Sequence, residues 1–210
     1  MDMSEIDTSK IVLVVVVIIV IWLIYSWCTS RRNKTNYVIQ QPNYPVPVQQ
    51  QQQQSSYDIP IANNVDLARY AGKWYEIART PVGYEEGCTS TTAHYTLNRN
   101  GSLSIHKLCV INGQEDQATG IAIPENGMLI PGTTVLKYGV MRASFHGKNF
   151  DDFIIMVLDP NYQYSMVGSR DKKNLWIWSR TPQLDPKVLQ SLVNYAAQYG
   201  FPVNTLISGQ

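Results

Sequence analysis

The residues of this chain that could do acid–base or metal chemistry form no recognisable catalytic group. His94 and His106 fall on neighbouring strand-like segments, but neither has a further ligand at the i, i+2 or i, i+4 spacing typical of zinc sites. His146 falls in a turn-like stretch. No serine lies in the G-x-S-x-G context of a nucleophile elbow. The sequence therefore predicts no metal site, no cofactor and no enzyme activity.

The charge distribution argues against a nucleic-acid partner. The 210 residues include 17 Lys plus Arg and 16 Asp plus Glu, which gives a net charge of +1 at pH 7. Beyond residue 57, basic residues are adjacent only at Lys172 and Lys173. Binding to nucleic-acid phosphates needs a concentrated basic stripe, so a different class of partner is expected.

The N-terminal region contains one long apolar run. Residues 11–28 carry no charge, and as a helix they would span about 27 Å, close to the thickness of a bilayer's hydrocarbon core. Aromatic and then basic residues follow at its C-terminal end, as at membrane interfaces: Trp22, Tyr25, Trp27, Arg31, Arg32 and Lys34. A cleaved signal peptide is the alternative, but the acidic residues 1–10 do not resemble its positive leader. We expect a short tail at 1–10 and a single-pass transmembrane anchor at 11–28.

Residues 29–63 have the composition of a flexible linker. Three prolines, at positions 42, 45 and 47, precede a run of glutamines at 49–54. Such a segment buries too little apolar surface to offset the loss of chain entropy on folding. We expect a disordered linker that tethers a folded domain at 64–210 to the membrane.

From residue 64 onward, short segments of strand-like residues alternate with turn residues. Asn98-Arg99-Asn100-Gly101 and Asn112-Gly113 are strong hairpin signals, and together with the strand-like segments they predict an antiparallel meander. One helix is expected near the end, with Asp185 as its N-cap, Pro186 in its first turn and Gly200 at its C-terminus. The predicted strands are 74–79, 89–97, 102–111, 117–123, 133–138, 139–145, 153–158, 164–168 and 175–179.

Three motifs in this region resemble those of the lipocalin family. The first is Gly-x-Trp at 72–74, the second is D-P-x-Y-x-Y-x-x-V-G at 159–168, and the third is the late Arg180 after a tryptophan-rich strand. The second motif is similar to the bacterial-type branch, which includes apolipoprotein D-like proteins. The resemblance implies an all-β, eight-stranded up-and-down antiparallel barrel with a C-terminal helix packed outside it. It also implies that Gly72, Trp74 and Arg180 form a structural motif in which the arginine lies across the indole.

The resemblance also implies a small hydrophobic ligand inside the barrel, such as a fatty acid or a lysophospholipid. Side chains that share the parity of Trp74 would face inward, which adds Glu76 and Ala78, with Ala93, Tyr95 and Leu97 beside them. Two alternatives stay open. The barrel could be filled, as in a structural or interaction protein, or it could be an enzyme on a lipophilic substrate with Glu76 as its acid.

Cys88 and Cys109 flank the first predicted hairpin, and counting outward from its turn brings them within reach of each other. The resemblance favours a disulfide between them, although two free thiols are the alternative. A disulfide would indicate a lumenal or exterior domain, or one inside an enclosed particle. The basic residues after the anchor favour the cytoplasmic side instead, so the sequence leaves the orientation open.

Overall fold

The computed structural model of this chain describes residues 57–145, 147 and 149–209. The predicted tail at 1–10, the predicted anchor at 11–28 and residues 29–56 of the predicted linker lie outside this part of the chain. Among the described residues, no helix is both long and apolar enough to cross a membrane.

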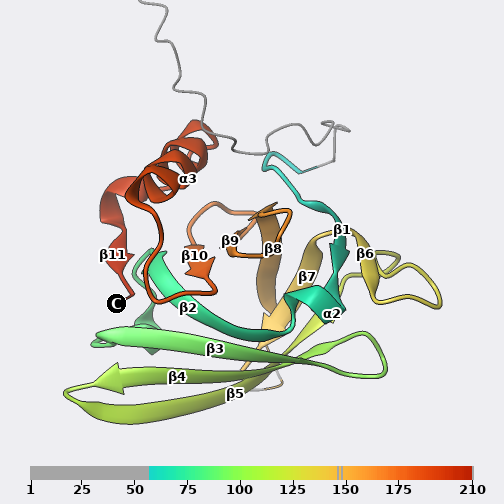
Figure 1. The fold of residues 1–210 in the computed structure, drawn as a ribbon, viewed down its shortest axis with the longest axis horizontal. Helices are drawn as coiled ribbons and strands as arrows, with labels where there is room; N and C mark the ends of the chain where they lie inside the picture. The colour runs from blue at the N-terminus through green and yellow to red at the C-terminus, as the bar shows by residue number, and fades with distance from the viewer. Residues whose placement is uncertain (1–56, 146, 148, 210) are drawn as a thin grey trace, which may run out of the picture. The chain divides into compact units, whose positions relative to one another are not determined.

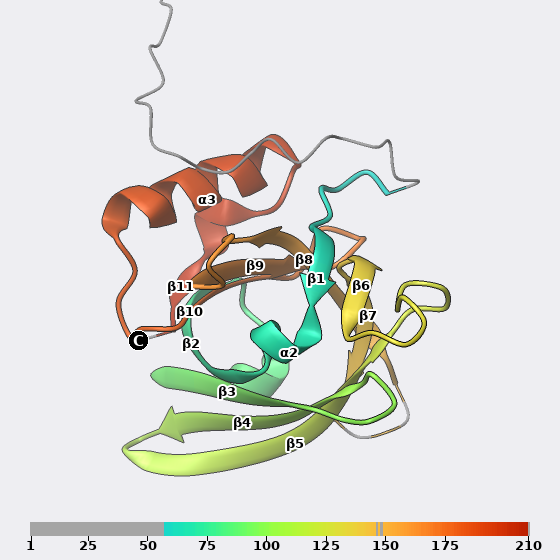
Figure 2. The same cartoon turned by 45° about the vertical axis from the view of Figure 1, so that its right-hand side comes forward.

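A closed antiparallel β-barrel forms the body of the described domain (Figures 1 and 2). Each strand pairs with the next along the sheet, and the last strand, β10, also pairs with the first, β2, which closes the ring. The prediction of an eight-stranded up-and-down barrel is therefore confirmed. The barrel strands are β2 (Gly72–Arg79), β3 (Ser90–Leu97), β4 (Leu103–Ile111), β5 (Gln114–Pro124), β7 (Val140–Ser144), β8 (Asp151–Leu158), β9 (Tyr164–Gly168) and β10 (Leu175–Ser179).

Local turn chemistry fixes the register of the hairpins. Gly101 has a φ of +80° in the turn between β3 and β4, where the Asn98 N–H donates to the Ser102 carbonyl over 2.8 Å. Asn112 and Gly113 have φ values of +52° and +78° in the turn between β4 and β5, as a two-residue hairpin of type I′ requires. Strand β5 begins at Gln114, earlier than its predicted start at residue 117, because it pairs with β4 right up to this turn.

The residues just before the barrel are also folded. Strand β1 (Asn63–Asp66) pairs with β6 (Val135–Tyr138) in a separate two-stranded sheet, so the predicted strand at 133–138 lies outside the barrel ring. Ile59 and Ala62 are buried, 3% exposed each. The end of the predicted linker thus belongs to the folded domain. The sequence did not reveal β1, because its four residues show no clear alternation.

A short helix, α2 (Leu67–Tyr70), lies across the end of the barrel at which β2 begins (Figure 2). The side chain of Asp66 caps it by accepting a hydrogen bond from the Ala68 N–H over 2.9 Å. We call this end of the barrel the floor and the opposite end, where β2 finishes, the far end.

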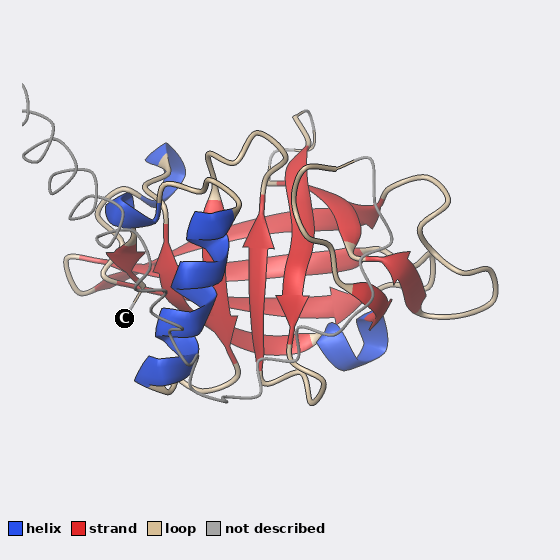
Figure 3. Ribbon diagram, turned by 90° about the horizontal axis from the view of Figure 1, so that it is seen from above, coloured by secondary structure: helices blue, strands red, loops and turns tan. Residues whose placement is uncertain are grey.

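The predicted C-terminal helix is present as α3 (Pro186–Gln198) and lies against the outside of the barrel (Figure 3). The Asp185 carboxylate accepts from the Lys187 N–H over 2.7 Å, and Gly200 has a φ of +84° just beyond the helix. Two single turns, η1 (Gly83–Glu85) and η2 (Val203–Thr205), and a short last strand, β11 (Ile207–Ser208), complete the described elements.

The strands separate two apolar cores because successive side chains point to opposite faces. In β10, Trp176 and Trp178 face the interior core, whereas Leu175 and Ile177 face the core beneath α3. The interior core includes Trp74, Tyr95, Leu103, Ile105, Met141 and Phe153, and the outer core includes Met166, Leu192, Ala196 and Phe201.

Arg180 joins the first barrel strand to the last at the floor. Its guanidinium carbon lies 3.8 Å from the centre of the Trp74 ring, so the predicted cation–π contact is present. The same side chain donates hydrogen bonds of 2.8–3.1 Å to backbone carbonyls at the end of α2, at the start of β2 and in the turn before β9. These carbonyls belong to Arg69, Tyr70, Ala71, Lys73 and Tyr162. The carbonyl groups at the C-terminal end of α2, which have no hydrogen-bond partner within the helix, thereby accept hydrogen bonds from Arg180.

Trp74→Ala and Arg180→Ala should destabilise the domain non-additively. Removing the indole creates a core cavity that costs about 3–5 kcal/mol, and removing the guanidinium loses the same contact as well as the carbonyl hydrogen bonds. Chemical denaturation of both single variants and the double variant measures the coupling. Arg170→Ala, on the surface, is the control and should not couple to Trp74→Ala. Strict additivity for Arg180 would contradict the contact.

Candidate functional site in the barrel interior

Four charged side chains lie buried together inside the barrel, and we call them the charged quartet. Glu76 and Arg79 come from β2, Glu85 from η1 and Lys107 from β4. Their exposed fractions are 0%, 1%, 2% and 7%. Charges are rarely buried unless they are paired, so this cluster marks the part of the interior that packing alone does not explain.

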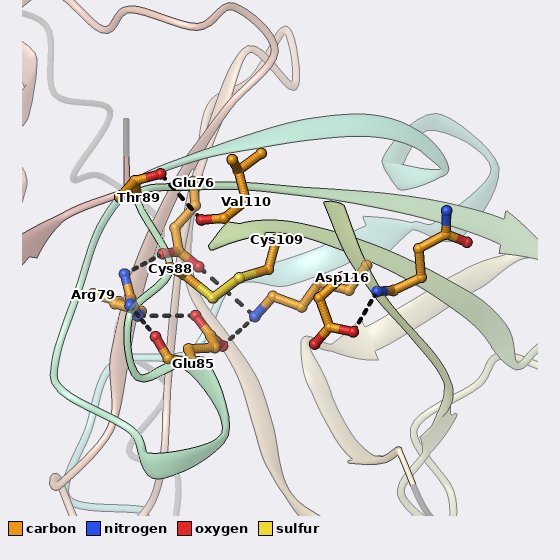
Figure 4. Close-up of a disulfide and its surroundings, with 10 residues drawn as sticks. Glu76, Arg79, Glu85, Cys88, Thr89, Cys109, Val110 and Asp116 are labelled. Atoms are coloured by element: carbon orange, nitrogen blue, oxygen red, sulfur yellow. Dashed lines mark hydrogen bonds and ion pairs between the residues drawn. A yellow bond between two sulfur atoms is a disulfide. The ribbon is translucent and has the colours of Figure 1, made fainter. Parts of the chain in front are cut away.

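The quartet is held by short polar contacts. Figure 4 shows the Arg79 guanidinium between the carboxylates of Glu76 and Glu85. Arg79 Nη1 lies 3.0 Å from Glu76 Oε1, its Nε lies 2.9 Å from Glu85 Oε2, and its Nη2 donates to the Glu85 carbonyl over 2.7 Å. Lys107 Nζ donates to Glu85 Oε1 and lies 3.7 Å from Glu76 Oε2.

An irregularity in the pairing of β2 with β10 decides which side chains of β2 face inward. Glu76 lies opposite Trp178 and Ala78 lies opposite Ile177, so β2 contains one extra residue at this step. The parity therefore changes, and Ala78 packs in the outer core beneath α3. The prediction that Ala78 faces the interior is wrong for this reason, and Arg79 faces inward in its place.

Two aromatic rings lie close to the Lys107 ammonium. Its nitrogen is 5.5 Å from the centre of the Trp178 ring and 5.7 Å from that of Tyr84. Tyr84 is 61% exposed and also contacts Phe145, with 6.2 Å between the ring centres. Lys107 thus contacts both a buried indole and an exposed phenol, with cation–π stabilisation from both.

A disulfide fastens the loop that carries Glu85. Cys88 and Cys109 are bonded, with their Cα atoms 5.5 Å apart, which confirms the predicted pair. Next to it, the N–H and hydroxyl of Thr89 both donate to the Val110 carbonyl, over 2.8 Å and 3.0 Å. The segment between β2 and β3 is therefore tied to β4 just beyond Glu85 (Figure 4).

The C-terminal tail fills the space where β2 and β3 separate. Gly209 donates to the Ile77 carbonyl over 3.1 Å and accepts from the Thr91 N–H over 3.0 Å. A Cβ on Gly209 would lie 2.6 Å from the Glu76 carbonyl oxygen and 2.7 Å from its Cγ. The tail therefore packs directly on the backbone of Glu76, and this close approach requires glycine.

Burial changes the acidity of Glu76. Loss of solvation raises the pKa of Glu76 to about 8, and the neighbouring Glu85 carboxylate acts in the same direction. Lys107 and Arg79 lower the pKa of Glu76, but they do not outweigh the effect of burial. Glu76 therefore retains its proton to a higher pH than an exposed glutamate does.

The structure brings most of the predicted interior residues together. Trp74, Glu76, Ala93 and Tyr95 are buried inside the barrel, and Leu97 packs half-buried against the same core. Gly72 has a φ of +99°, and a Cβ there would lie 3.3 Å from the Arg180 guanidinium. It therefore leaves room for the arginine.

Sequence reasoning missed Arg79, Glu85, Lys107, Trp176 and Trp178 as parts of the interior site. The signal for Lys107 was present, because it shares the parity of Leu103, Ile105 and Cys109 in β4. Glu85 lies in a loop, where no periodic pattern indicates whether a side chain points into or out of the barrel.

The histidines lie away from this site. His94 and His106 are directly opposite each other on β3 and β4 and are both exposed. His106 Nε2 lies 3.3 Å from Gln117 Oε1. Within the described ranges, no group of three or more His, Cys, Asp or Glu residues could hold a metal ion. His146 lies outside those ranges.

A family model described as a lipocalin-like domain matches residues 65–210. This chain belongs to the lipocalin family. Lipocalin R877 of Acanthamoeba polyphaga mimivirus is 33% identical to this chain over 73% of this chain and 89% of that protein. Outer membrane lipoprotein Blc of Escherichia coli K12 is 32% identical over 71% of this chain and 81% of that protein. Apolipoprotein D of Bos taurus is 31% identical over 63% of this chain and 70% of its own length. These relatives support the bacterial-type branch of the lipocalins.

Solved structures agree on the fold. Insecticyanin from Manduca sexta superposes with a TM-score of 0.54 at 23% identity, covering 72% of this chain and 84% of that one. At this level of identity the match shows the lipocalin fold alone.

Replacing both Cys88 and Cys109 with serine should lower the free energy of unfolding by about 3 kcal/mol, because the disulfide closes a loop of 21 residues. Denaturation of the oxidised protein and of the variant measures the difference, and Cys28→Ser is the matched control. Thiol counting on the unreduced, unfolded chain should find one free thiol of the three cysteines. Three free thiols would contradict the disulfide.

Glu76 should make folding stability depend on pH. Its folded pKa is raised from 4.5 to about 8, so its contribution is fully present below the unfolded value and is lost as pH rises through the folded one. The free energy of unfolding of the wild type should therefore fall, relative to that of Glu76→Gln, as the pH rises from about 5 to about 9. Glu86→Gln, which changes an exposed neighbour, should show no such trend. Parallel profiles for wild type and Glu76→Gln would contradict the raised pKa.

Proposed function

We propose that this lipocalin binds a small hydrophobic molecule, a fatty acid or a lysophospholipid, inside its barrel, and that it does so without chemical conversion. Binding by burial needs an enclosed apolar surface and a few polar groups that orient the ligand. Membership of the lipocalin family supports the binding of a small hydrophobic ligand, and the inner face of this barrel offers the apolar surface for it.

The proposal rests on apolar side chains of the inner face that the protein's own packing does not bury completely. At the floor, Trp74 and Leu103 are fully buried, whereas Leu97, opposite Leu103, is half-buried. Towards the far end, Ala143, Phe145 and Trp176 pack on the same interior core but are only partly buried. Incompletely buried apolar side chains on the inner face of a closed barrel are what an alkyl chain would cover.

We also propose that the chain is anchored in a membrane through residues 11–28, with the barrel on an oxidising side or in an enclosed particle. The apolar run supports the anchor, and relatives named as outer membrane lipoproteins support membrane association. The disulfide between Cys88 and Cys109 supports the oxidising compartment, since such bonds are rare in the cytosol.

A filled barrel that acts as a structural or interaction protein is the second candidate. The dense floor favours it, because Trp74, Ala93 and Tyr95 are all 3% exposed or less. Small barrels can be filled completely by their own side chains. The two candidates differ in whether the purified protein retains and rebinds a lipid.

The delipidated full chain should bind dodecanoic acid one to one with micromolar affinity, about 8 kcal/mol, in isothermal titration. Ala143→Trp should weaken this binding by at least about tenfold by filling the partly buried inner face, and Ala197→Trp, on the exposed face of α3, should not. Native mass spectrometry of the protein before delipidation should show a bound lipid. No saturable binding by well-folded protein would favour the filled barrel.

A further inference from the structure

Two buried hydrogen-bond donors inside the barrel have no acceptor within the described part of the protein. They are the indole N–H groups of Trp176 and Trp178, whose Nε1 atoms are inaccessible to solvent. Trp178 as a whole is only 3% exposed. A buried donor without an acceptor costs free energy, so native structures usually satisfy such groups.

The two residues that carry these donors adjoin the charged quartet. Trp176 lies directly across from Arg79 in the β2–β10 pairing, and Trp178 lies across from Glu76. Lys107 approaches from β4, with its nitrogen 5.5 Å from the Trp178 ring centre. Its ammonium has three donors, and the hydrogen bond found among the described residues goes to Glu85. The inner face therefore offers a cation and two neutral donors in one region.

The charge balance of the quartet also favours an anion. Burial raises the pKa of Glu76, so this carboxyl keeps its proton to a higher pH than an exposed glutamate does, and its negative charge in the quartet is reduced. Burial also raises the pKa of Tyr95, the nearby titratable group from β3, which therefore stays neutral. The two cationic side chains, Arg79 and Lys107, are then opposed mainly by the Glu85 carboxylate. A buried excess of positive charge is stabilised by an anionic partner.

We propose that Lys107 and the indole N–H groups of Trp176 and Trp178 form a subsite for the anionic headgroup of the ligand, which makes the barrel selective for amphiphiles with an ionised head over neutral ones. The inference rests on the proposed function, because it assigns a headgroup site to the same interior. The alkyl chain lies against the partly buried residues at the far end, Ala143 and Phe145.

The shared chemistry is an anionic oxygen at the end of an alkyl chain. A carboxylate accepts several hydrogen bonds and pairs with an ammonium, as does the phosphate of a phospholipid-like ligand. An alcohol of the same chain length buries the same apolar surface but carries no charge. Three ligands separate these contributions, namely dodecanoic acid, dodecyl phosphate and dodecanol.

The test is isothermal titration of the delipidated full chain near neutral pH, with each ligand below its micellar concentration. At least one of the two anionic ligands should bind about tenfold tighter than dodecanol, because a charge-assisted hydrogen bond strengthens binding by about that factor. The comparison between acid and phosphate shows which headgroup the subsite prefers.

Three variants locate the selectivity. Lys107→Met should reduce affinity for the preferred anion about tenfold and reduce dodecanol binding much less, and Lys173→Met is the matched control on an exposed lysine. Glu85→Gln should tighten anion binding, because it removes the negative charge beside Lys107. Trp178→Phe keeps the ring but removes its N–H, and it should weaken anion binding by a few fold. Lys107→Met alone would leave the buried Glu85 carboxylate without its lysine partner. If that variant does not fold, the double variant Lys107→Met/Glu85→Gln replaces it, because it removes this carboxylate as well.

The outcomes separate this inference from the proposed function. If all three ligands bind with equal affinity, the hydrophobic binding site stands and the headgroup subsite is refuted. If none binds to folded protein, the proposed function fails and the subsite fails with it. If selectivity is present but survives in both Lys107→Met and the double variant, the assignment to Lys107 is wrong.

Discussion

The main features of this domain follow from the pairing of β2 with β10. It closes the barrel, and it places Arg180 against Trp74 at the floor, where the guanidinium also satisfies the backbone carbonyls that end α2. The extra residue of β2 in this pairing sends Ala78 outward and Arg79 inward. One strand pair thus determines both the closed floor and the polar character of the interior above it.

The side chains of the charged quartet are held together by the elements that carry them. Arg79 is positioned by β2, Lys107 by β4, and Glu85 by a loop that the disulfide holds to the barrel wall. Removing one partner from such a cluster would leave an uncompensated buried charge, which is far more costly than the cluster contributes to stability. Stability alone therefore does not explain why the barrel keeps such a network in its interior. Binding the polar headgroup of a ligand would explain it.

Much of the fold was predictable from local patterns, whereas the site was predictable only in part. The hairpin turns, the caps of α3 and the Trp74–Arg180 contact follow from short motifs with a direct physical reason. Ala78 was misplaced because a strand bulge depends on the partner strand and leaves no periodic signal. Glu85 was missed because its direction is set by a disulfide-bound loop, and β1 because four residues are too few to show alternation.

We place an amphiphile inside the barrel, beside the indole N–H groups of β10 that have no acceptor among the described residues. The indole ¹H–¹⁵N signals of the full chain, followed during a titration with dodecanoic acid, test this placement most directly. We expect saturable shifts for the Nε1–H signals of Trp176 and Trp178. The signal of Trp74, whose Nε1–H already donates to the Tyr70 carbonyl over 2.8 Å, should move little. Unchanged signals for both β10 indoles in folded protein would contradict this placement.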